Sequence, residues 1–472
     1  MGQATGGRGG MAVISHSSRT GGRLPRGPHR LTADQVAADQ RQRLIEAMVQ
    51  LAGKNGYAAT TVAGIIERAE VSRKTFYAHF ADREKLLLAA FDTTSRVVLE
   101  EVRIASQRTG GATRQIEALT RRLCRVARES PSTIALSTNE IAALDPTGLE
   151  HRELLMGDYG ELIDECLRAN SKQPALPSML ARALAGGAHR TIDAYLRTGR
   201  SLELSALAPE LARWTRSYHP VPSTLTTGET PSPSWPCIGS NGLIGGRAPG
   251  TLTLAPNGYQ PPRATRSSGY VHHTNRERIL DAVTQLVSAH GYTTLTAQSI
   301  AEHADLSERA FLAHFKNKDD AFASAMEVGH TKGQAIVERA RSNAPDWPTG
   351  VRHAIYALLE FLASEPDFTR LAFIDAPLAG TRMTRRTYEH AGAYARLLLD
   401  GAPQRRRPSP IAPEATVHGL FELAFHHAAQ HKVPELPRVT REATYLALAP
   451  FVGVAEAAEM AVERTSELST SS

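Results

Sequence analysis

The stretch VSRKTFYAHF, residues 71–80, decides the fold of this chain of 472 residues. Ser72 is a residue type that caps the N-terminus of a helix, and Arg73, Lys74 and Thr75 then fill the first helical turn. The helix macrodipole favours anions at that end, so folding alone does not call for two basic residues there. The two cations therefore need an explanation outside the helix.

A near copy of this stretch, LSERAFLAHF, occurs at residues 306–315. When residues 43–91 are placed over residues 278–326, at an offset of 235 and without a gap, 16 positions are identical. Apolar residues exchange for apolar residues between the identities, which predicts two copies of one structural unit. The identities include Gly56/Gly291, Tyr57/Tyr292, Thr61/Thr296, Ile65/Ile300, Ser72/Ser307, Phe76/Phe311, His79/His314 and Phe80/Phe315.

The repeat extends beyond this unit. Residues 183–207 and 415–439 share the same apolar spacing at an offset near 232, so each half of the chain is expected to contain a small helical unit and a larger helical part. Between the halves, residues 219–272 contain nine Pro and eight Gly without an apolar period. Such a segment cannot bury enough apolar surface to fold, and it is predicted to be a linker.

Each small unit has the pattern of a helix-turn-helix. Apolar residues at three- and four-residue steps give the first helix one apolar face, and a glycine then ends that helix. Three further helices follow, each with a capping residue at its start. A short turn separates the second helix of the unit from the third. In the first copy these residues are Leu44, Met48, Leu51, Ala52, Gly56, Thr61, Ser72 and Asp82; in the second copy they are Ile279, Leu280, Val283, Leu286, Gly291, Thr296, Ser307 and Asn317.

The string T-x3-I-x3-A-x-V-S-x3-F-Y-x-H-F-x2-[KR]-x2-L at residues 61–86 resembles the TetR family of bacterial transcriptional regulators. The resemblance is strong at 40–91, clear at 275–326 and limited to a compatible helical pattern elsewhere. It implies an all-α tandem protein, in which each helix-turn-helix domain precedes a helical domain that binds a ligand and dimerises. The glycine usual in the turn is replaced by Glu70 in the first copy and Asp305 in the second.

These observations predict the organisation of the chain. We expect two disordered tails, a linker, two helix-turn-helix domains, of which the second is a candidate for degeneration, and two helical regulatory domains. The ranges are a basic tail 1–30, helix-turn-helix domain 31–92, regulatory domain 93–218, linker 219–272, helix-turn-helix domain 273–326, regulatory domain 327–463 and tail 464–472.

The resemblance also explains the two cations of the third helix. The N-terminal end of a recognition helix reaches base edges in the major groove, where Arg73 or Lys74 would donate to guanine. By resemblance, other polar residues would hold phosphates and set the register. A solvated helix face is the competing interpretation for the cations, and simple packing is the one for His79. The predicted DNA-binding residues are Thr61, Ser72, Arg73, Lys74, Thr75, Tyr77, His79 and Arg83 in the first copy, and Ser307, Arg309, His314 and Lys318 in the second.

The two copies differ in charge. Residues 40–91 hold eight Lys/Arg and five Asp/Glu, a net +3, whereas residues 275–326 hold five Lys/Arg and seven Asp/Glu, a net −2. Glu308, Ala310 and Leu312 replace Arg73, Thr75 and Tyr77. Because DNA affinity depends largely on cations, we favour weakened binding by the second copy over the alternative, that it reads a different half-site.

In the family, the last two long helices form a four-helix bundle with those of a partner. Here they are expected at 174–196 with 203–218, and at 411–430 with 437–462. One chain could close this bundle on itself as a pseudo-dimer, or two chains could pair as a homodimer. A ligand pocket is expected among the middle helices, although plain core packing is the simpler interpretation of each aromatic candidate: Tyr159, Trp214, Phe361, Phe368, Phe373 and Tyr394.

Other classes of protein find little support. Cys124, Cys166 and Cys237 have no paired spacing, no long apolar run predicts a membrane helix, and no signal peptide or catalytic motif is present. The string HHAAQH (426–431) lacks a further residue to complete a metal site. We expect a cytoplasmic, non-enzymatic regulator without cofactor or metal, acting as a ligand-responsive repressor with a double-stranded DNA operator. The alternative is a helical module that sequesters a ligand or another regulator without sequence-specific DNA binding.

Overall fold

The computed structural model describes residues 32–226 and 274–462, which we call the first and second halves. Every regular element in these ranges is helical. The first half contains α1 (Ala33–Asn55), α2 (Val62–Ala69), α3 (Arg73–His79), α4 (Arg83–Gln107), α5 (Ala112–Glu129), α6 (Pro131–Thr138), α7 (Thr147–Leu167), α8 (Ser178–Arg197), α9 (Leu204–Arg216) and α10 (Ser223–Thr226). The second half contains α11 (Asn275–His290), α12 (Ala297–His303), α13 (Glu308–His314), α14 (Lys318–Ser342), α15 (Trp347–Ser364), α16 (Pro366–Arg370), α17 (Thr381–Leu399), α18 (Ala412–Ala429), α19 (Thr440–Val452) and α20 (Val454–Val462).

Short 3-10 segments link some of these helices, and one π-helical turn, Leu371–Asp375, follows α16. The 3-10 segments are η1 (Glu140–Leu144), η2 (Ser201–Glu203), η3 (Tyr292–Thr294), η5 (Ala376–Ala379) and η6 (Val433–Val439). Across the described ranges, no helix combines the length and the apolar character needed to span a bilayer. The expected tails and most of the expected linker lie outside the described residues.

The predicted helix starts and stops are confirmed in both copies. Gly56 and Gly291 end the first helix of each unit with φ of +84° and +76°, a conformation that a residue with a Cβ rarely adopts. Every predicted N-cap side chain accepts a hydrogen bond from the backbone N–H three residues on: Thr61, Ser72 and Asp82 in the first unit, and Thr296, Ser307 and Asn317 in the second.

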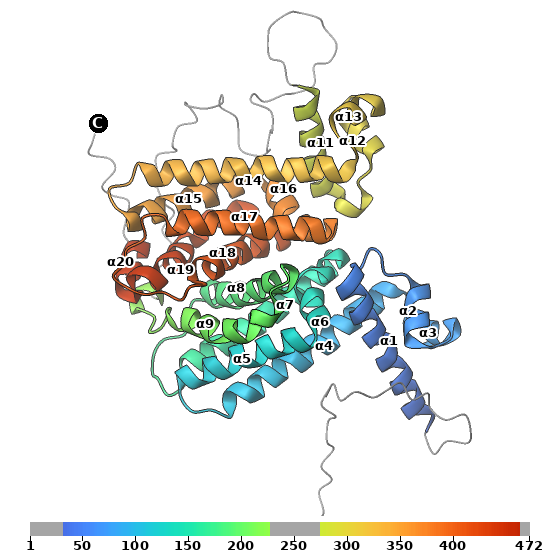
Figure 1. The fold of residues 1–472 in the computed structure, drawn as a ribbon, viewed down its shortest axis with the longest axis horizontal. Coiled ribbons are helices and arrows are strands. Elements are labelled where there is room, and N and C mark those ends of the chain that lie inside the picture. Colours follow the sequence, from blue (N-terminus) through green and yellow to red (C-terminus); the bar gives the residue numbers. More distant parts are fainter. Residues whose placement is uncertain (1–31, 227–273, 463–472) are drawn as a thin grey trace, which may run out of the picture.

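The two halves lie against each other, and both helix-turn-helix units point to the same end of the molecule (Figure 1). The contact between the halves, which we call the seam, centres on α8 of the first half and α18 of the second. A Cβ atom at Gly187 would lie 2.8 Å from Ala415 O, and one at Gly419 would lie 2.9 Å from Ala183 O. The two glycines, equivalent in the repeat, therefore allow the two helix backbones to approach closely.

The segment that follows α9 belongs to the folded part for longer than the composition suggests. Residues 219–226, expected to begin the linker, include α10, which packs on α20 of the second half. Val221 and Leu225 are buried in this contact. Arg441 of the second half also donates a hydrogen bond to Leu225 O, so apolar and polar contacts together hold the segment.

Candidate nucleic-acid interface

The turn between the second and third helices has the same backbone conformation in both units. Glu70 and Asp305 adopt the left-handed region with φ of 51° and 53°, the position where a glycine was expected. An arginine of the first helix holds each turn. Arg43 Nη1 donates to Ala69 O at 2.9 Å and to Glu70 O at 3.3 Å, and Arg278 Nη2 donates to Asp305 O at 3.0 Å.

The outward face of α3 carries the residues predicted to read bases. Phe76 is fully buried and fixes the helix to the core, whereas Arg73 and Lys74 are exposed and Tyr77 is 49% exposed. Ser72 Oγ accepts from Thr75 N at 3.0 Å, which begins the helix at Arg73. The structure thus brings these predicted residues together on one exposed surface, with the Arg73 guanidinium 5.9 Å from the centre of the Tyr77 ring.

The residues predicted to contact phosphates in the first unit differ in how free their side chains are. Thr61 is exposed at the start of α2, and His79 Nε2 lies 3.4 Å from Gln40 Oε1. The Arg83 side chain already has partners within the protein. Its Nη1 donates to Thr60 O at 2.5 Å, and its guanidinium lies 4.3 Å from the centre of the Tyr57 ring. Arg83 therefore braces the loop after α1 against α4, and its phosphate contact stays a prediction.

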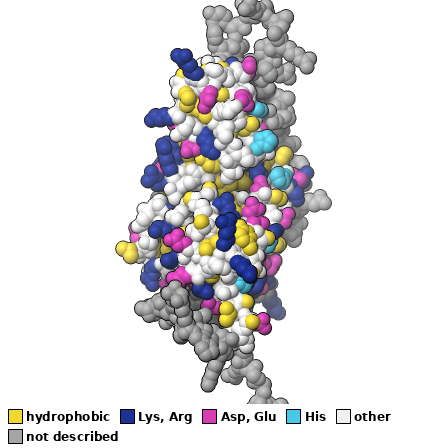
Figure 2. Space-filling model, turned by 90° about the vertical axis from the view of Figure 1, so that its right-hand side faces the viewer, with side chains coloured by type: hydrophobic (Ala, Val, Ile, Leu, Met, Phe, Trp, Pro, Cys, Tyr) yellow, Lys and Arg dark blue, Asp and Glu magenta, His cyan; other side chains and the backbone are white. Residues whose placement is uncertain are grey.

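The second unit has the same frame with a different outward face. Arg309 and His314 are exposed, beside an exposed Glu308 and a Leu312 side chain that is 53% exposed. Lys318, which replaces Arg83, lies with its Nζ 4.7 Å from the centre of the Tyr292 ring. Ser307 caps α13, as Ser72 caps α3. The view onto the end that carries both units shows basic and acidic side chains interspersed (Figure 2).

Comparison with known proteins agrees with this geometry. The family described as "Bacterial regulatory proteins, tetR family" matches residues 44–90 and again residues 279–325. The chain carries two tetR-family helix-turn-helix units in tandem. Both matches end within the first helical turns after the predicted recognition helices, so they cover the frame described above and not the larger helical parts.

Two curated relatives from Bacillus subtilis (strain 168) are uncharacterized HTH-type transcriptional regulators. YvkB is 29% identical over 127 residues, which is 27% of this chain and 65% of YvkB. YerO is 38% identical over 52 residues, which is 11% of this chain and 18% of YerO. The matches therefore span less than two thirds of either relative.

Solved structures with a similar fold each align with less than two fifths of the chain. The fatty acid degradation regulator FadR from Bacillus halodurans is 15% identical, with a TM-score of 0.35, and the alignment covers 38% of this chain and 94% of that one. A TetR family transcription regulator from Marinobacter aquaeolei VT8 is 21% identical, with a TM-score of 0.30, and the alignment covers 38% and 96%.

Each tetR unit is fastened to its regulatory part by a carboxylate that the sequence reading missed, half-buried in the first half and buried in the second. Glu140 Oε2 accepts from Tyr57 N at 2.8 Å, and Asp375 Oδ1 accepts from Tyr292 N at 2.9 Å. We call Glu140 and Asp375 the docking carboxylates. They are 235 residues apart, the same offset as the two tetR units, and this shared offset was the signal that would have found them.

Burial disfavours the charged form of both docking carboxylates. Burial raises the pKa of Glu140, against the opposing effects of the Tyr57 N–H and Arg197. Burial likewise raises the pKa of Asp375 to about 6, although the Tyr292 N–H and Arg370 lower it in part. Both groups are thus held close to the loop that follows the first helix of a tetR unit, in surroundings that disfavour their charge.

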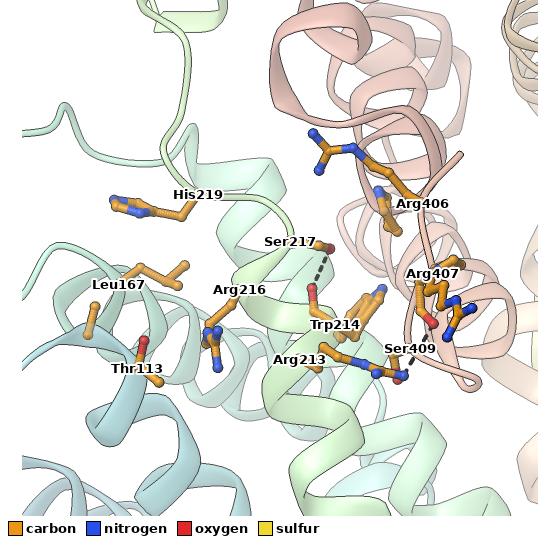
Figure 3. A pocket seen from close by; sticks show the side chains of 13 residues that line it. Thr113, Leu167, Arg213, Trp214, Arg216, Ser217, His219, Arg406, Arg407 and Ser409 are labelled. Atoms are coloured by element: carbon orange, nitrogen blue, oxygen red, sulfur yellow. Dashed lines mark hydrogen bonds between the residues drawn. The ribbon is translucent and has the colours of Figure 1, made fainter. Parts of the chain in front are cut away.

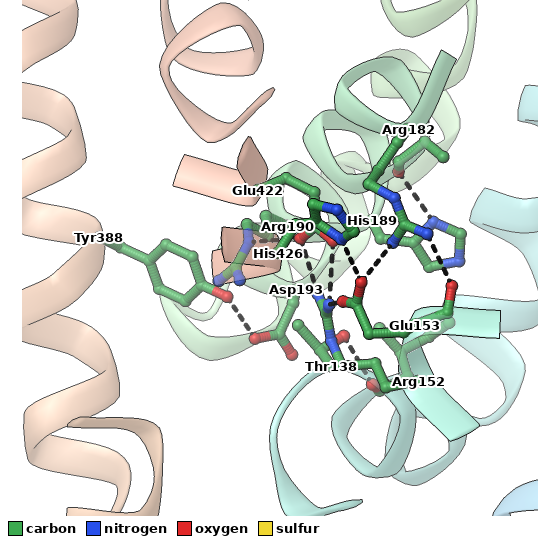
Figure 4. A network of polar contacts seen from close by, with 12 residues as sticks. Thr138, Arg152, Glu153, Arg182, His189, Arg190, Asp193, Tyr388, Glu422 and His426 are labelled. Atoms are coloured by element: carbon green, nitrogen blue, oxygen red, sulfur yellow. Dashed lines mark hydrogen bonds and ion pairs between the residues drawn. The ribbon is translucent and has the colours of Figure 1, made fainter. Parts of the chain in front are cut away.

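An arginine links each docking carboxylate to the seam. Arg197 lies 4.0 Å from Glu140 and 3.1 Å from Asp193, and Asp193 accepts a hydrogen bond from the Tyr388 hydroxyl of the second half (Figure 4). In the second half, Arg370 lies 3.7 Å from Asp375 and pairs with Asp145 of the first half. Each tetR unit is therefore connected through polar contacts to the opposite half.

The centre of the seam is a buried ionic cluster (Figure 4). Glu422 of the second half is fully buried and accepts from Arg152 Nη1 at 2.9 Å, from Arg152 Nη2 at 2.7 Å and from Arg190 Nε at 3.2 Å. Burial alone would raise the pKa of Glu422, but Arg152 and Arg190 lower it to about 2. The cluster therefore stays charged, and its positive members come from the first half.

One histidine of HHAAQH (426–431) pairs across the seam, and its neighbour contacts its own helix. His426 Nδ1 pairs with Glu153 of the first half, and His427 Nδ1 lies 2.8 Å from Leu423 O. No group of three or more metal-ligating side chains occurs within residues 32–226 and 274–462. His431, four residues after His427, is exposed.

Proposed function

We propose that this chain is a sequence-specific DNA-binding transcriptional regulator in which the first tetR unit is the main reader. One observation carries the proposal: Arg73, Lys74 and Tyr77 form an exposed surface on the N-capped third helix of a tetR-family unit. Cations there oppose the helix macrodipole, whereas in a major groove they face guanine edges and phosphates. Such a regulator works in the cytoplasm, as the sequence predicts.

Selection of duplexes from a random pool by the purified full-length chain tests this function. We expect one site to be enriched, and the enrichment to disappear in a variant with Arg73, Lys74 and Tyr77 changed to Ala. Unchanged melting of both proteins, followed by circular dichroism, confirms that the variant is folded. Absence of enrichment at low salt would refute the proposal and favour the helical module that sequesters a ligand or another regulator.

We further propose that a single chain forms the DNA-binding assembly, as an intramolecular pseudo-dimer. Arg190 and Glu422 occupy equivalent positions of the repeat at an offset of 232 and pair across the seam. In a homodimer that paired like with like, two copies of Arg190 would face each other in a buried site, and so would two copies of Glu422. Burying like charges without partners is strongly unfavourable, so the two halves suit each other better than copies of themselves.

Light scattering of the purified chain tests this arrangement. We expect the mass of one chain at micromolar concentration, both free and, after subtraction of the DNA, when bound to the selected duplex. The selected site should be asymmetric, because two different units face it. Two chains per duplex together with a palindromic site would overturn the pseudo-dimer.

An effector of apolar character would bind in the second half by widening two small cavities in its core. If the bound effector lowered the affinity of the protein for DNA, the protein would act as a repressor. Two small apolar cavities, of about 20 and 50 Å³, lie between α14, α15, α17 and α18, and Phe368, Phe373 and Tyr394 of the predicted set line them. His330 borders the smaller cavity, and its buried Nε2 has no hydrogen-bond partner among the described residues. Tyr159 and Trp214, also predicted, pack elsewhere: Tyr159 on His189, and Trp214 across the seam against Thr416.

The effector site can be tested with the apolar dye Nile red. We expect a saturable rise in fluorescence that Leu358→Trp abolishes, because this partly buried residue borders both cavities and the larger side chain would fill them. Saturating dye should also weaken binding to the selected duplex, since a ligand shifts a conformational equilibrium when it prefers one state. Dye binding without any effect on DNA affinity would contradict the regulatory role.

A further inference from the structure

A second opening in the molecule has the opposite character to the apolar cavities. It is a cleft of about 500 Å³ at the seam, lined by residues of both halves (Figure 3). Arg213, Arg216 and His219 line it from the first half, and Arg406 and Arg407 line it from the second. This volume lies within the range of small-molecule sites in proteins, which is about 300–1,000 Å³.

The charges around the cleft are not balanced. Arg213 pairs with Glu210 at 2.9 Å, and Arg216 lies 3.6 Å from Glu117. Arg406 and Arg407 are exposed, and no carboxylate of the described residues lies within ion-pair distance of either. The cleft therefore has an excess of positive charge contributed by both halves, which by itself opposes their association.

The loop that carries these arginines is nevertheless fastened in place. Ser409 Oγ lies 3.0 Å from Glu210 O and 2.7 Å from Glu210 Oε2, and Arg213 Nη2 donates to Pro408 O at 3.2 Å. A Cβ atom at Gly453 would lie only 2.5 Å from Arg406 Nη2, so the Arg406 guanidinium rests against the Gly453 backbone. The contacts hold the cations of the second half beside those of α9.

A neutral polar group completes the cleft. His219 Nε2 is buried and has no hydrogen-bond partner among the described residues. Burial lowers the pKa of His219, so its ring is neutral at neutral pH and offers one donor or one acceptor. An unpartnered polar atom of this kind is costly unless a ligand or a water satisfies it.

We propose that this cleft binds a multiply charged anion of the phosphate class, held by arginines from both halves. A guanidinium offers donors in a fork that matches two phosphate oxygens, and several of them suit a group with more than one negative charge. The bound anion would offset the repulsion between the halves and thereby stabilise the seam. This site is separate from the apolar effector site and does not depend on the proposed DNA-binding function.

Titration calorimetry with inorganic pyrophosphate tests the site. The full-length chain carries Arg73→Ala and Lys74→Ala in every arm, so that the exposed cations of α3 cannot bind the probe. We expect one saturable site per chain in the millimolar range or tighter. Arg406→Gln and Arg407→Gln should each weaken it about tenfold, the loss expected for a charge-assisted hydrogen bond. Pyrophosphate should also raise the melting temperature, and this rise should disappear with the binding.

Arg405→Gln is the matched control, because Arg405 is an exposed neighbour in the same loop that does not line the cleft. It should leave the affinity almost unchanged. Absence of saturable binding, or an equal loss in the Arg405 and Arg406 variants, would overturn the proposal and leave only general attraction to a basic surface. Because Arg405, Arg406 and Arg407 are all exposed, the variants are expected to fold, which circular dichroism would verify.

Discussion

The two tetR units keep the same frame and present different surfaces. Both have a pair of buried phenylalanines, capped helices, a left-handed turn residue and a docking carboxylate, although the net charge changes from +3 over residues 40–91 to −2 over residues 275–326. The charged residues that differ on the recognition helices, such as Arg73 and Glu308, are exposed. The comparison teaches that a repeated fold is maintained by its buried and capping positions, while its binding surface is free to diverge.

A second contrast lies in the seam, where equivalent positions have become complementary. Arg190 and Glu422 are opposite in charge and buried against each other, and Arg152 adds a bidentate contact to Glu422. Divergence on the tetR surface gives the two units opposite net charges. Divergence in the seam has a different consequence, because each half now depends on the other.

The largest effect should follow from breaking the complementarity of the seam. Glu422→Gln would leave Arg152 and Arg190 buried without an anion, so we expect the free energy of unfolding to fall by about 3–5 kcal/mol. Urea denaturation followed by circular dichroism measures this change. The control is Glu435→Gln, which removes an exposed contact to Arg438 at 3.1 Å and should cost less than about 1 kcal/mol. Equal losses in the two variants would mean that the buried cluster does not hold the halves together.

A smaller effect should separate the two recognition helices. Changing Arg73 and Lys74 together to Ala should weaken binding to the selected duplex about 100-fold, because each base contact contributes about 1–3 kcal/mol and 1.4 kcal/mol is tenfold. The matched change of Glu308 and Arg309 to Ala should alter affinity by less than about fivefold, since it removes one cation and one anion. Fluorescence anisotropy with a labelled duplex measures both. If the second pair matters as much as the first, both units read bases.

The fold could be predicted from local patterns, whereas contacts between residues far apart in the sequence could not be read from such patterns. Helix caps at Thr61, Ser72 and their counterparts, together with Gly56 and Gly291, are short-range signals, and the structure places each as predicted. The docking carboxylates and the Arg152–Glu422 contact join residues 83 to 270 positions apart. A charged residue in a helix has the same appearance in the sequence whether it is solvated or buried against a distant partner.

The candidate site could be predicted only in part, because local patterns reveal which residues face outward but not which contacts they make. Exposure of Arg73, Lys74 and Tyr77 follows from the helical position of Phe76, which has to face the core. The engagement of Arg83 with Thr60 O and the Tyr57 ring depends on the path of the loop after α1, which no local pattern reveals. Sequence therefore located the surface, whereas the structure distinguishes side chains that are free from those already engaged.

The docking carboxylates should make the stability of the chain depend on pH. Since burial raises the pKa of Asp375 to about 6 against about 3.9 in an unfolded chain, the folded state binds this proton more tightly. The associated stability is fully present below about pH 4 and is lost as the pH rises through 6. Relative to Asp375→Asn, which cannot ionise, the natural chain should therefore lose about 2 kcal/mol of stability between pH 4 and 7.

Denaturation at a series of pH values measures this difference. Glu140→Gln should change the profile in the same direction, because the pKa of Glu140 is also raised by burial. The exposed Glu456, changed to Gln, supplies the control and should leave the profile of the natural chain unchanged. A flat difference between the natural chain and Asp375→Asn would mean that the second tetR unit is not docked through this carboxyl group.

The turns supply the smallest effect and the finest comparison of the two units. Glu70 and Asp305 share a left-handed backbone that glycine adopts without cost, and aspartate tolerates it better than glutamate does. Glu70→Gly should therefore stabilise the chain by up to about 1 kcal/mol. Asp305→Gly should bring less, because it also removes a carboxylate 3.4 Å from Arg278 Nη2. Thermal denaturation of the two variants shows which substitution stabilises the chain more. A larger gain from Asp305→Gly would mean that the second turn is the more strained, and that the turn at Glu70 is relaxed although glutamate suits this conformation less well than aspartate does.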